Sequence, residues 1–275
     1  MEQTMTDDLL ADAFERLLQT HCTPAHVREI ENGASPDVLW EEIEQSGFAD
    51  ALLSEDKGGA DLALRDVFPL VLLCGRYALP VPMAETMVAR AAFAAAGQEV
   101  PKGPIAWSDD IPFETPELRR STGALVAAGL LVGVLERAFE ITVEFANDRT
   151  QFGRPIGKFQ AVQQLLSIMA EQTFAAKMAA EIGFASDGWM PDPLLAALAK
   201  SRSSDAAALV SAHAHAVHGA IGATEEYDLQ LFTRRIQQGR TAFGSETYWN
   251  RLIGETVIAS GEDGVLDNIR QNLSA

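Results

Sequence analysis

Residues 117–160 read ELRRSTGALVAAGLLVGVLERAFEITVEFANDRTQFGRPIGKFQ. The part over 117–147 carries apolar residues at helical spacing with few breakers, so it predicts one long helix. The stretch 149–157 that follows contains glycine and proline and therefore predicts a loop. Two further helices are predicted at 158–184 and 193–218, separated by SDGWMPDP. Because alternating strand patterns are nearly absent, about four or five antiparallel helices and an all-α fold are expected.

A proline-rich segment at 101–116, PKGPIAWSDDIPFETP, interrupts the helical pattern. Its four prolines and its lack of a helical period predict a linker or a short extended piece. The chain before it is also helical in pattern, as in SPDVLWEEIEQSG, which has Pro36 near its start and Gly47 at its end. We therefore expect an N-terminal helical domain over 1–100, a linker over 101–116 and a C-terminal helix bundle over 117–275.

Charge and composition exclude several classes of protein. The chain has 39 acidic and 21 basic residues, so nucleic acid and anionic membrane surfaces are not expected partners. Cys22 and Cys74 are too few for a disulfide framework or a cysteine-based zinc site. The N-terminal MEQTMTDDLL is acidic, unlike a signal peptide, and the longest apolar run, 123–135, is too short to span a bilayer. These features predict a cytoplasmic protein.

The loop at 149–157 is the first candidate binding motif. Arg149 presents a fork of hydrogen-bond donors that suits a diphosphate. Gly153 and Gly157 allow a tight turn and a close approach of the backbone. The same composition also suits a basic loop that only closes a helix bundle. The residues alone leave both interpretations open.

The sequence HGAIGAT at 218–224 is the second candidate motif. Its small residues let a phosphate or another backbone come close, and the alternative is an ordinary helix end and turn. His213, His215 and His218 cluster beside it. They lack an obvious carboxylate at helical spacing, so no metal site is expected and a core or interface position is favoured.

Arg234, Arg235 and Glu246 form the third candidate group. The arginine pair suits either a solvated face or the binding of phosphate or a partner. Glu246 suits either a general base or a first-turn glutamate stabilised by the dipole of the helix that follows. The sequence contains no G-x-S-x-G, P-loop, G-x-G-x-x-G or H-E-x-x-H motif. The commonest hydrolase, nucleoside triphosphate, Rossmann and zinc-protease functions are thereby excluded.

Four stretches, in this order, resemble the acyl-CoA dehydrogenase family. LWEEIEQSGFADALLSEDKGGADL (39–62) resembles its N-terminal helix and E-x-x-G-G loop, and YALPVPMAET (77–86) resembles the region after that loop. RTQFGRPIGKFQAVQQLLSIMAE (149–171) is similar to the family's R-x-x-F-G-x-x-I-x-x-F-Q stretch and is the most specific match. HAVHGAIGATEEYDLQLFTRR (215–235) resembles its H-G-G-x-G segment. Together the stretches cover both helical regions.

The resemblance implies an FAD cofactor, an acyl-CoA substrate and α,β-desaturation of that CoA thioester. In the family a carboxylate removes the α proton, and the β hydrogen leaves as hydride to the flavin. The two C-terminal motifs contact FAD that a neighbouring subunit binds. The residues that the resemblance assigns to FAD are Arg149, Gln151, Phe152 and Gln160 in the first motif and Gly219, Ala220 and Gly222 in the second.

The departures from the family pattern are equally specific. The family has a middle β-domain between its helical domains, and the 16 residues of the segment 101–116 are too short to form one. The family's catalytic glutamate falls on Phe243 or Gly244 here, or in some members near Gly123, and neither location is acidic. Glu246 lies close to the first location and is the candidate base. Ala216 stands where the family often has a glutamine that touches FAD.

The resemblance therefore implies a short, non-catalytic chain of a heteromer such as a heterotetramer, in which a longer acyl-CoA dehydrogenase-like partner supplies the β-domain and the base. By the same analogy the substrate is a bulky CoA thioester such as a steroid side chain, and electron-transfer flavoprotein is the electron acceptor. Two alternatives stay open. In the first alternative the chain is a self-sufficient minimal dehydrogenase with Glu246 as base. In the second it is a scaffold subunit without flavin.

Overall fold

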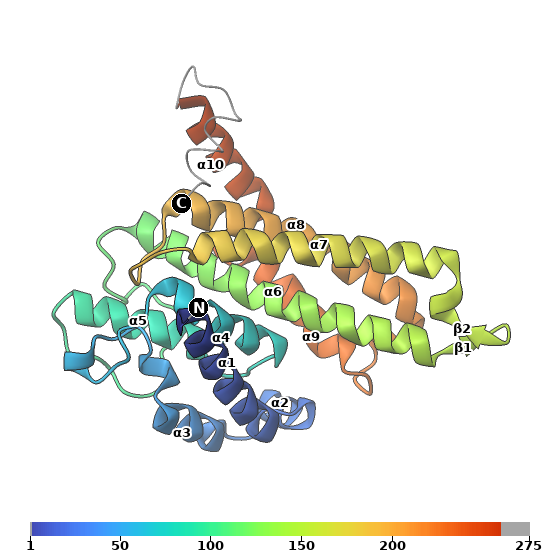
Figure 1. The fold of residues 1–275 in the computed structure, drawn as a ribbon, viewed down its shortest axis with the longest axis horizontal. Coiled ribbons are helices and arrows are strands. Elements are labelled where there is room, and N and C mark those ends of the chain that lie inside the picture. Colours follow the sequence, from blue (N-terminus) through green and yellow to red (C-terminus); the bar gives the residue numbers. More distant parts are fainter. Residues whose placement is uncertain (1, 260–275) are drawn as a thin grey trace.

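The helix α6 (Pro116–Asp148) is the longest in the computed structural model, which describes residues 2–259. It starts at a regular cap, because the side chain of Thr115 accepts a hydrogen bond from the amide of Leu118 at 3.1 Å. Pro116, at the first helical position, has no amide hydrogen, so no hydrogen-bond donor is left unpaired there. Figure 1 shows α6 running along most of the molecule's length.

Three further helices pack on α6 and complete the bundle, namely α7 (Gln160–Phe184), α8 (Pro193–His218) and α9 (Leu229–Thr241). Alanine is frequent at the buried positions of α7 and α8, which lets these helix backbones lie close together. The observed bounds of α6, α7 and α8 agree with the predicted helices to within two residues. The expected all-α, antiparallel fold is confirmed.

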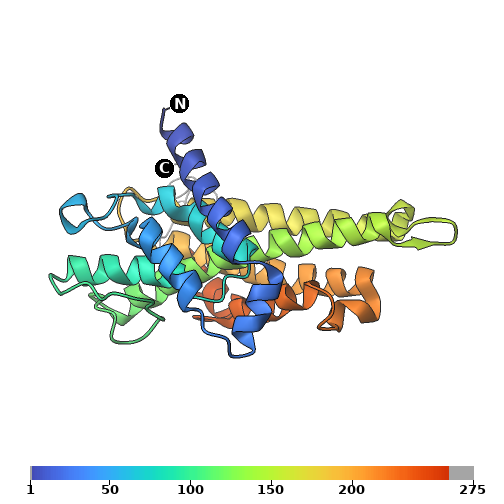
Figure 2. The same ribbon diagram turned by 90° about the horizontal axis from the view of Figure 1, so that it is seen from below.

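The N-terminal helices lie together on one side of the bundle (Figures 1 and 2). They are α1 (Glu2–His21), α2 (Pro24–Glu31), α3 (Asp37–Ser46), α4 (Leu64–Arg76) and α5 (Met83–Ala95), with short 3-10 turns at Phe48–Asp50 and Glu55–Lys57. Helix α4 lies directly on α6, and the two backbones approach closely at Gly75 and Gly133. One hydrophobic cluster joins both parts, with members from α1 to α5 and from α6 to α9.

The segment between α5 and α6 contains no helix or strand over residues 96–115. It is tied to α5 by Thr86, whose hydroxyl accepts a hydrogen bond from the amide of Ile105 at 2.8 Å. The guanidinium of Arg90, itself held by Glu44 and Asp50, donates to the carbonyl of Gly103 at 3.2 Å. The segment is thus an extended strap on the protein surface, and the middle β-domain is missing, as predicted.

The only strands within residues 2–259 are β1 (Thr150–Gln151) and β2 (Arg154–Pro155), which pair in a small hairpin. In both views this hairpin projects beyond the end of the bundle (Figures 1 and 2). Helix α10 (Glu246–Ala259) leaves the opposite part of the bundle and buries Trp249 against α6 and α8. Of the helices that the structure describes, none is long and apolar enough to cross a membrane.

Candidate functional site

The hairpin between α6 and α7 is built to expose side chains. Thr150 pairs with Pro155 and Gln151 with Arg154, which leaves Phe152 and Gly153 as a two-residue turn. Both turn residues have positive φ, +52° and +78°, as a tight hairpin of this kind requires. A phenylalanine in this conformation is uncommon. The Phe152 side chain is 92% exposed at the tip, so the hairpin presents an aromatic ring to solvent.

A groove of about 400 Å³ lies between this hairpin and the end of α8. Of the predicted cofactor residues it is lined by Arg149 and Gln151 from one side and by Gly219 and Ala220 from the other. The guanidinium of Arg149 makes no ion pair or side-chain hydrogen bond with any residue of the described chain, and it is exposed. The groove therefore holds an unpaired cation beside the exposed end of a helix.

His218 forms the buried floor of the groove. Its ring stacks on Phe145 with 4.3 Å between the ring centroids, and its Nδ1 lies 2.8 Å from the carbonyl oxygen of Ala214. A carbonyl only accepts, so Nδ1 carries the hydrogen and Nε2 is the free acceptor in the neutral ring. Burial lowers the His218 pKa, so the ring is neutral at pH 7. Nε2 is buried and has no partner among the described residues.

Three predicted cofactor residues lie outside the groove lining, and one of them is Phe152 at the hairpin tip. Gly222 is buried under Leu229 and His218, where an added Cβ would lie 2.9 Å from the Cβ of His218. Gln160 is exposed at the first position of α7, outside the groove lining. The sequence argument did not assign Phe145, Ile156 or His218 to the groove. For His218 the sequence did indicate a buried position in a core or interface, although not a place in this groove.

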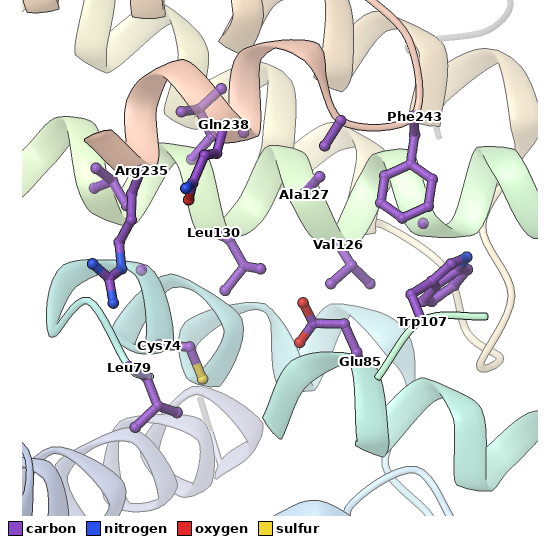
Figure 3. A pocket seen from close by; sticks show the side chains of 16 residues that line it. Cys74, Leu79, Glu85, Trp107, Val126, Ala127, Leu130, Arg235, Gln238 and Phe243 are labelled. Carbon is purple, nitrogen blue, oxygen red and sulfur yellow. The ribbon is translucent and has the colours of Figure 1, made fainter. Parts of the chain in front are cut away.

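A second cavity of about 290 Å³ lies between the N-terminal helices and the bundle (Figure 3). Residues from α4, α5, α6 and α9 line it, and Trp107 of the strap and Phe243 close one end. The locations predicted for the family's glutamate meet here, since an added Cβ at Gly123 would lie 2.5 Å from the Phe243 ring. Glu85 is the only carboxylate in the lining.

Glu246 lies outside that cavity. It is the first residue of α10, and its carboxylate forms an ion pair with Arg240. The hydrogen bond from Arg240 holds the Glu246 pKa below its usual value, against the opposing effect of burial. A carboxylate stabilised in its charged form is a weak proton acceptor. The geometry supports a structural role for Glu246, while its assignment as base stays a prediction.

The two arginines of α9 tie the bundle to the N-terminal helices. Arg234 and Arg235 both form ion pairs with Glu31 of α2, and Arg235 also donates to the carbonyl of Ala78 at 2.7 Å. Both guanidinium groups are therefore engaged in ion pairs within the chain. As for metals, the described residues contain no group of three histidine, cysteine or acidic side chains that would bind an ion.

Comparison with known proteins shows the family to which the chain belongs. Residues 121–258 match the family model for the C-terminal domain of acyl-CoA dehydrogenases, which is half of the chain. The chain belongs to the acyl-CoA dehydrogenase family, whose cofactor is FAD. The protein is thus an acyl-CoA dehydrogenase by family, without the middle β-domain.

Two curated relatives align over most of their length. Acyl-CoA dehydrogenase IpdE2 of Mycolicibacterium smegmatis is 26% identical over 297 residues, covering 86% of this chain and 94% of the relative. Its namesake in Mycobacterium tuberculosis is 27% identical and covers 82% of this chain and 89% of the relative.

Solved structures support the same fold. The steroid acyl-CoA dehydrogenase Tcur3481-Tcur3483 matches with a TM-score of 0.81 at 20% identity, covering 94% of this chain and 99% of that chain. The ChsE4-ChsE5 complex of Mycobacterium tuberculosis matches with a TM-score of 0.78 at 19% identity, covering 93% and 98%.

The groove at the hairpin fits part of an FAD molecule. Arg149 would present its guanidinium to a diphosphate, and Gly219 would leave the end of α8 open to it. The unpartnered Nε2 of His218 is a further polar contact in an otherwise satisfied region. Within the described residues the only sheet is the two-stranded hairpin beside the groove, and there is no larger sheet to cover a flavin ring.

Proposed function

We propose that this chain is one subunit of an FAD-dependent acyl-CoA dehydrogenase and that it shares the FAD site with a longer, related partner. The observation that carries the proposal is the groove at the hairpin. The groove brings together the unpaired guanidinium of Arg149 and the buried, unpartnered Nε2 of His218, and the exposed ring of Phe152 lies outside its lining, at the tip of the adjoining hairpin. Within residues 2–259 neither the guanidinium nor Nε2 has a polar partner, and Phe152 meets the Phe159 ring edge to face but stays 92% exposed. FAD carried by a second chain would offer a contact to all three groups.

In the proposed complex the residues of this chain bind and orient the cofactor. Arg149 donates charge-assisted hydrogen bonds to the diphosphate, and Gly219 leaves space for it at the end of α8. Phe152 covers an apolar part of the cofactor and shields it from water. His218 accepts a hydrogen bond at Nε2. FAD, when bound, supplies the oxidant that accepts hydride from the β carbon of the thioester.

The partner supplies the catalytic base in this proposal. At the two family locations this chain has Gly123 and Phe243, whose ring fills the space that a side chain at position 123 would need. Glu246 is held by Arg240. We propose that the proton acceptor for the α carbon comes from the other chain, together with the β-domain that walls the flavin.

Similar structures support both the two-chain assembly and the substrate class. Two of them carry two chain names each, and one is a steroid acyl-CoA dehydrogenase. We propose a steroid-type CoA thioester as substrate, a heterotetramer as assembly and electron-transfer flavoprotein as electron acceptor. The two buried, free cysteines, Cys22 and Cys74, agree with the cytoplasm as the proposed compartment.

An absorption spectrum tests the proposal. We expect the chain purified alone to be colourless, and a complex co-expressed with a longer dehydrogenase-like chain to show the flavin bands. Flavin bound to the chain alone would favour a self-sufficient dehydrogenase. A stable complex without flavin would favour the scaffold function.

A further inference from the structure

Arg154, on the second strand of the hairpin, is an exposed arginine that the flavin groove does not use. Its guanidinium forms no ion pair or hydrogen bond with any residue of the described chain. Gln151, which pairs with Arg154 in the hairpin, lines the groove, whereas Arg154 does not. One unpaired cation is therefore left over beside the groove.

The aromatic ring of Phe159 holds Arg154 in place. The guanidinium carbon of Arg154 lies over this ring, 4.2 Å from its centroid, which is a close cation–π contact. The other such contact within residues 2–259, between Arg120 and Tyr248, is longer at 5.5 Å. Because the ring attracts the charge of the guanidinium, the contact leaves the N–H donors of Arg154 free for another partner.

Phe159 is itself anchored at the end of the bundle. Its partly buried ring packs against the apolar cluster of Ala146, Ile156 and Val217, which joins α6 to α8. A side chain that is already held in one place loses little conformational freedom when it binds. The contact with Phe159 therefore prepares Arg154 to bind an anion.

The arm, residues 149–158, is a cationic part of an acidic chain. It contains Arg149, Arg154 and Lys158 and no acidic residue, whereas the whole chain has a net charge of −18. Surfaces of opposite charge attract one another, and the guanidinium fork matches the geometry of a carboxylate. The charge of the arm thus favours an acidic surface as its partner.

We propose that Arg154 binds a carboxylate on the surface of the longer partner chain and that Phe159 is its positioning residue. This proposal rests on the proposed shared flavin site and adds a protein contact beside it. When Arg149 reaches FAD on the partner, Arg154 of the same hairpin meets the partner's surface next to the cofactor. The occupant is the longer chain and not a second copy of this one, because the longer chain carries the FAD that the groove receives.

The dissociation constant of the complex co-purified with the longer dehydrogenase-like chain tests the proposal, measured by ultracentrifugation after dilution. Arg154→Ala is expected to weaken association at least about tenfold, because charge-assisted hydrogen bonds are lost. The flavin content of each assembled complex should stay unchanged, because Arg154 lies outside the groove lining. Arg16→Ala, at an exposed position of α1, is the matched control and should associate as the unmodified chain does.

The dependence of association on salt tests the carboxylate. Between about 50 and 200 mM NaCl, salt increasingly screens an exposed ion pair. Association of the unmodified chain should therefore weaken more over this range than association of Arg154→Ala. The same salt dependence for both complexes would overturn the assignment of a carboxylate.

Substitutions of Phe159 test its positioning role. Phe159→Leu keeps an apolar side chain but no ring face, so association should weaken about threefold. Phe159→Tyr keeps the ring face and should associate as the unmodified chain does. Phe159 acts through Arg154, so Phe159→Leu should have little further effect in the Arg154→Ala background. Equal losses in both backgrounds would refute the positioning role.

The same measurements separate failure of this proposal from failure of the proposed function. If the unmodified chains form no complex, the proposed function fails and this proposal fails with it. If they form a flavin-loaded complex that Arg154→Ala does not weaken, only the role of Arg154 is refuted. Loss of flavin at unchanged affinity would assign Arg154 to the cofactor, and weaker self-association of this chain alone would assign it to a second copy. Either result would overturn the proposal.

Discussion

Glu246, Arg240 and Lys200 lie together where α8, α9 and α10 meet. Glu246 pairs with Arg240, while Lys200 donates to Ser204 Oγ at 2.6 Å and to the carbonyl oxygen of Arg240 at 2.9 Å. These contacts fix α10 on the bundle. The spacing of Glu246 from the family's glutamate made it a candidate base, but the sequence does not show which carboxylates are already paired.

Replacing Glu246 by glutamine tests its role. We expect the flavin-loaded complex to keep its turnover within about twofold, because the carboxylate serves Arg240 and not the substrate. The melting temperature should fall by at most about 3 °C, since a partly exposed ion pair contributes about 0–1 kcal/mol. Steady-state kinetics and calorimetry measure both effects. Abolished turnover with FAD still bound would restore Glu246 as the base.

Lys200 should make stability depend on pH in the alkaline range. Burial lowers its pKa to about 8, although Glu246 opposes this effect. Between about pH 8 and 10.5 the unfolded chain binds more protons than the folded one, so the free energy of unfolding rises with pH. Below about pH 8 the buried charge of Lys200 lowers the free energy of unfolding by its full amount. Above about pH 10.5 it no longer lowers it.

A Lys200→Met variant isolates this effect. Relative to the variant, the unmodified chain should gain stability, on the order of 3 kcal/mol, from pH 8 to pH 10.5, at about 1.4 kcal/mol for each pKa unit. Urea unfolding at the two pH values measures the difference. A gap between the two proteins that stays constant with pH would contradict the lowered pKa.

At the scale of elements, the crossing of α4 on α6 joins the N-terminal helices to the bundle. An added Cβ at Gly133 would lie 1.9 Å from the carbonyl oxygen of Leu72, and one at Gly75 would lie 2.0 Å from that of Leu130. No side chain fits in either place without moving a helix backbone. The close approach therefore depends on these two glycines.

Gly133→Ala is expected to lower the free energy of unfolding by at least about 2 kcal/mol, because overpacking forces the helices apart. The matched control is Gly254→Ala in α10, where an added Cβ would meet nothing within 4 Å. The control should be neutral or more stable by up to about 1 kcal/mol, since alanine favours a helix more than glycine does. Denaturant unfolding measures both, and equal effects would refute the packing explanation.

Helices were the part of the fold that the sequence predicted best. Long periodic stretches with caps such as Thr115 and Asp192 specify α6 and α8 locally. The groove was predicted only in part, because Arg149 and Gly219 belong to recognisable motifs, whereas Phe145 and His218 meet through packing of α6 on α8. The burial of Gly222 and the pairing of Arg235 with Glu31 likewise depend on tertiary contacts that no local pattern contains.

At the scale of the whole molecule, a strap replaces a domain. Residues 96–115 pass directly from α5 to α6, and Trp107 of this strap closes the inner cavity. The hairpin projects at the far end of the bundle (Figure 1), and its Phe152 side chain is 92% exposed. The exposed hairpin and the lack of a β-domain within the described residues are the features that support the proposed partner chain.

The most direct test of the shared site is the flavin content of the co-purified complex with Arg149→Ala. The matched control is Arg16→Ala, which removes an exposed arginine of α1 far from the groove. We expect the Arg149→Ala complex to bind FAD at least about tenfold more weakly, because charge-assisted hydrogen bonds to the diphosphate are lost. The control complex should keep its full content, measured as flavin absorbance per complex. Equal flavin content in both complexes would show that the arm does not hold the cofactor and would contradict the account.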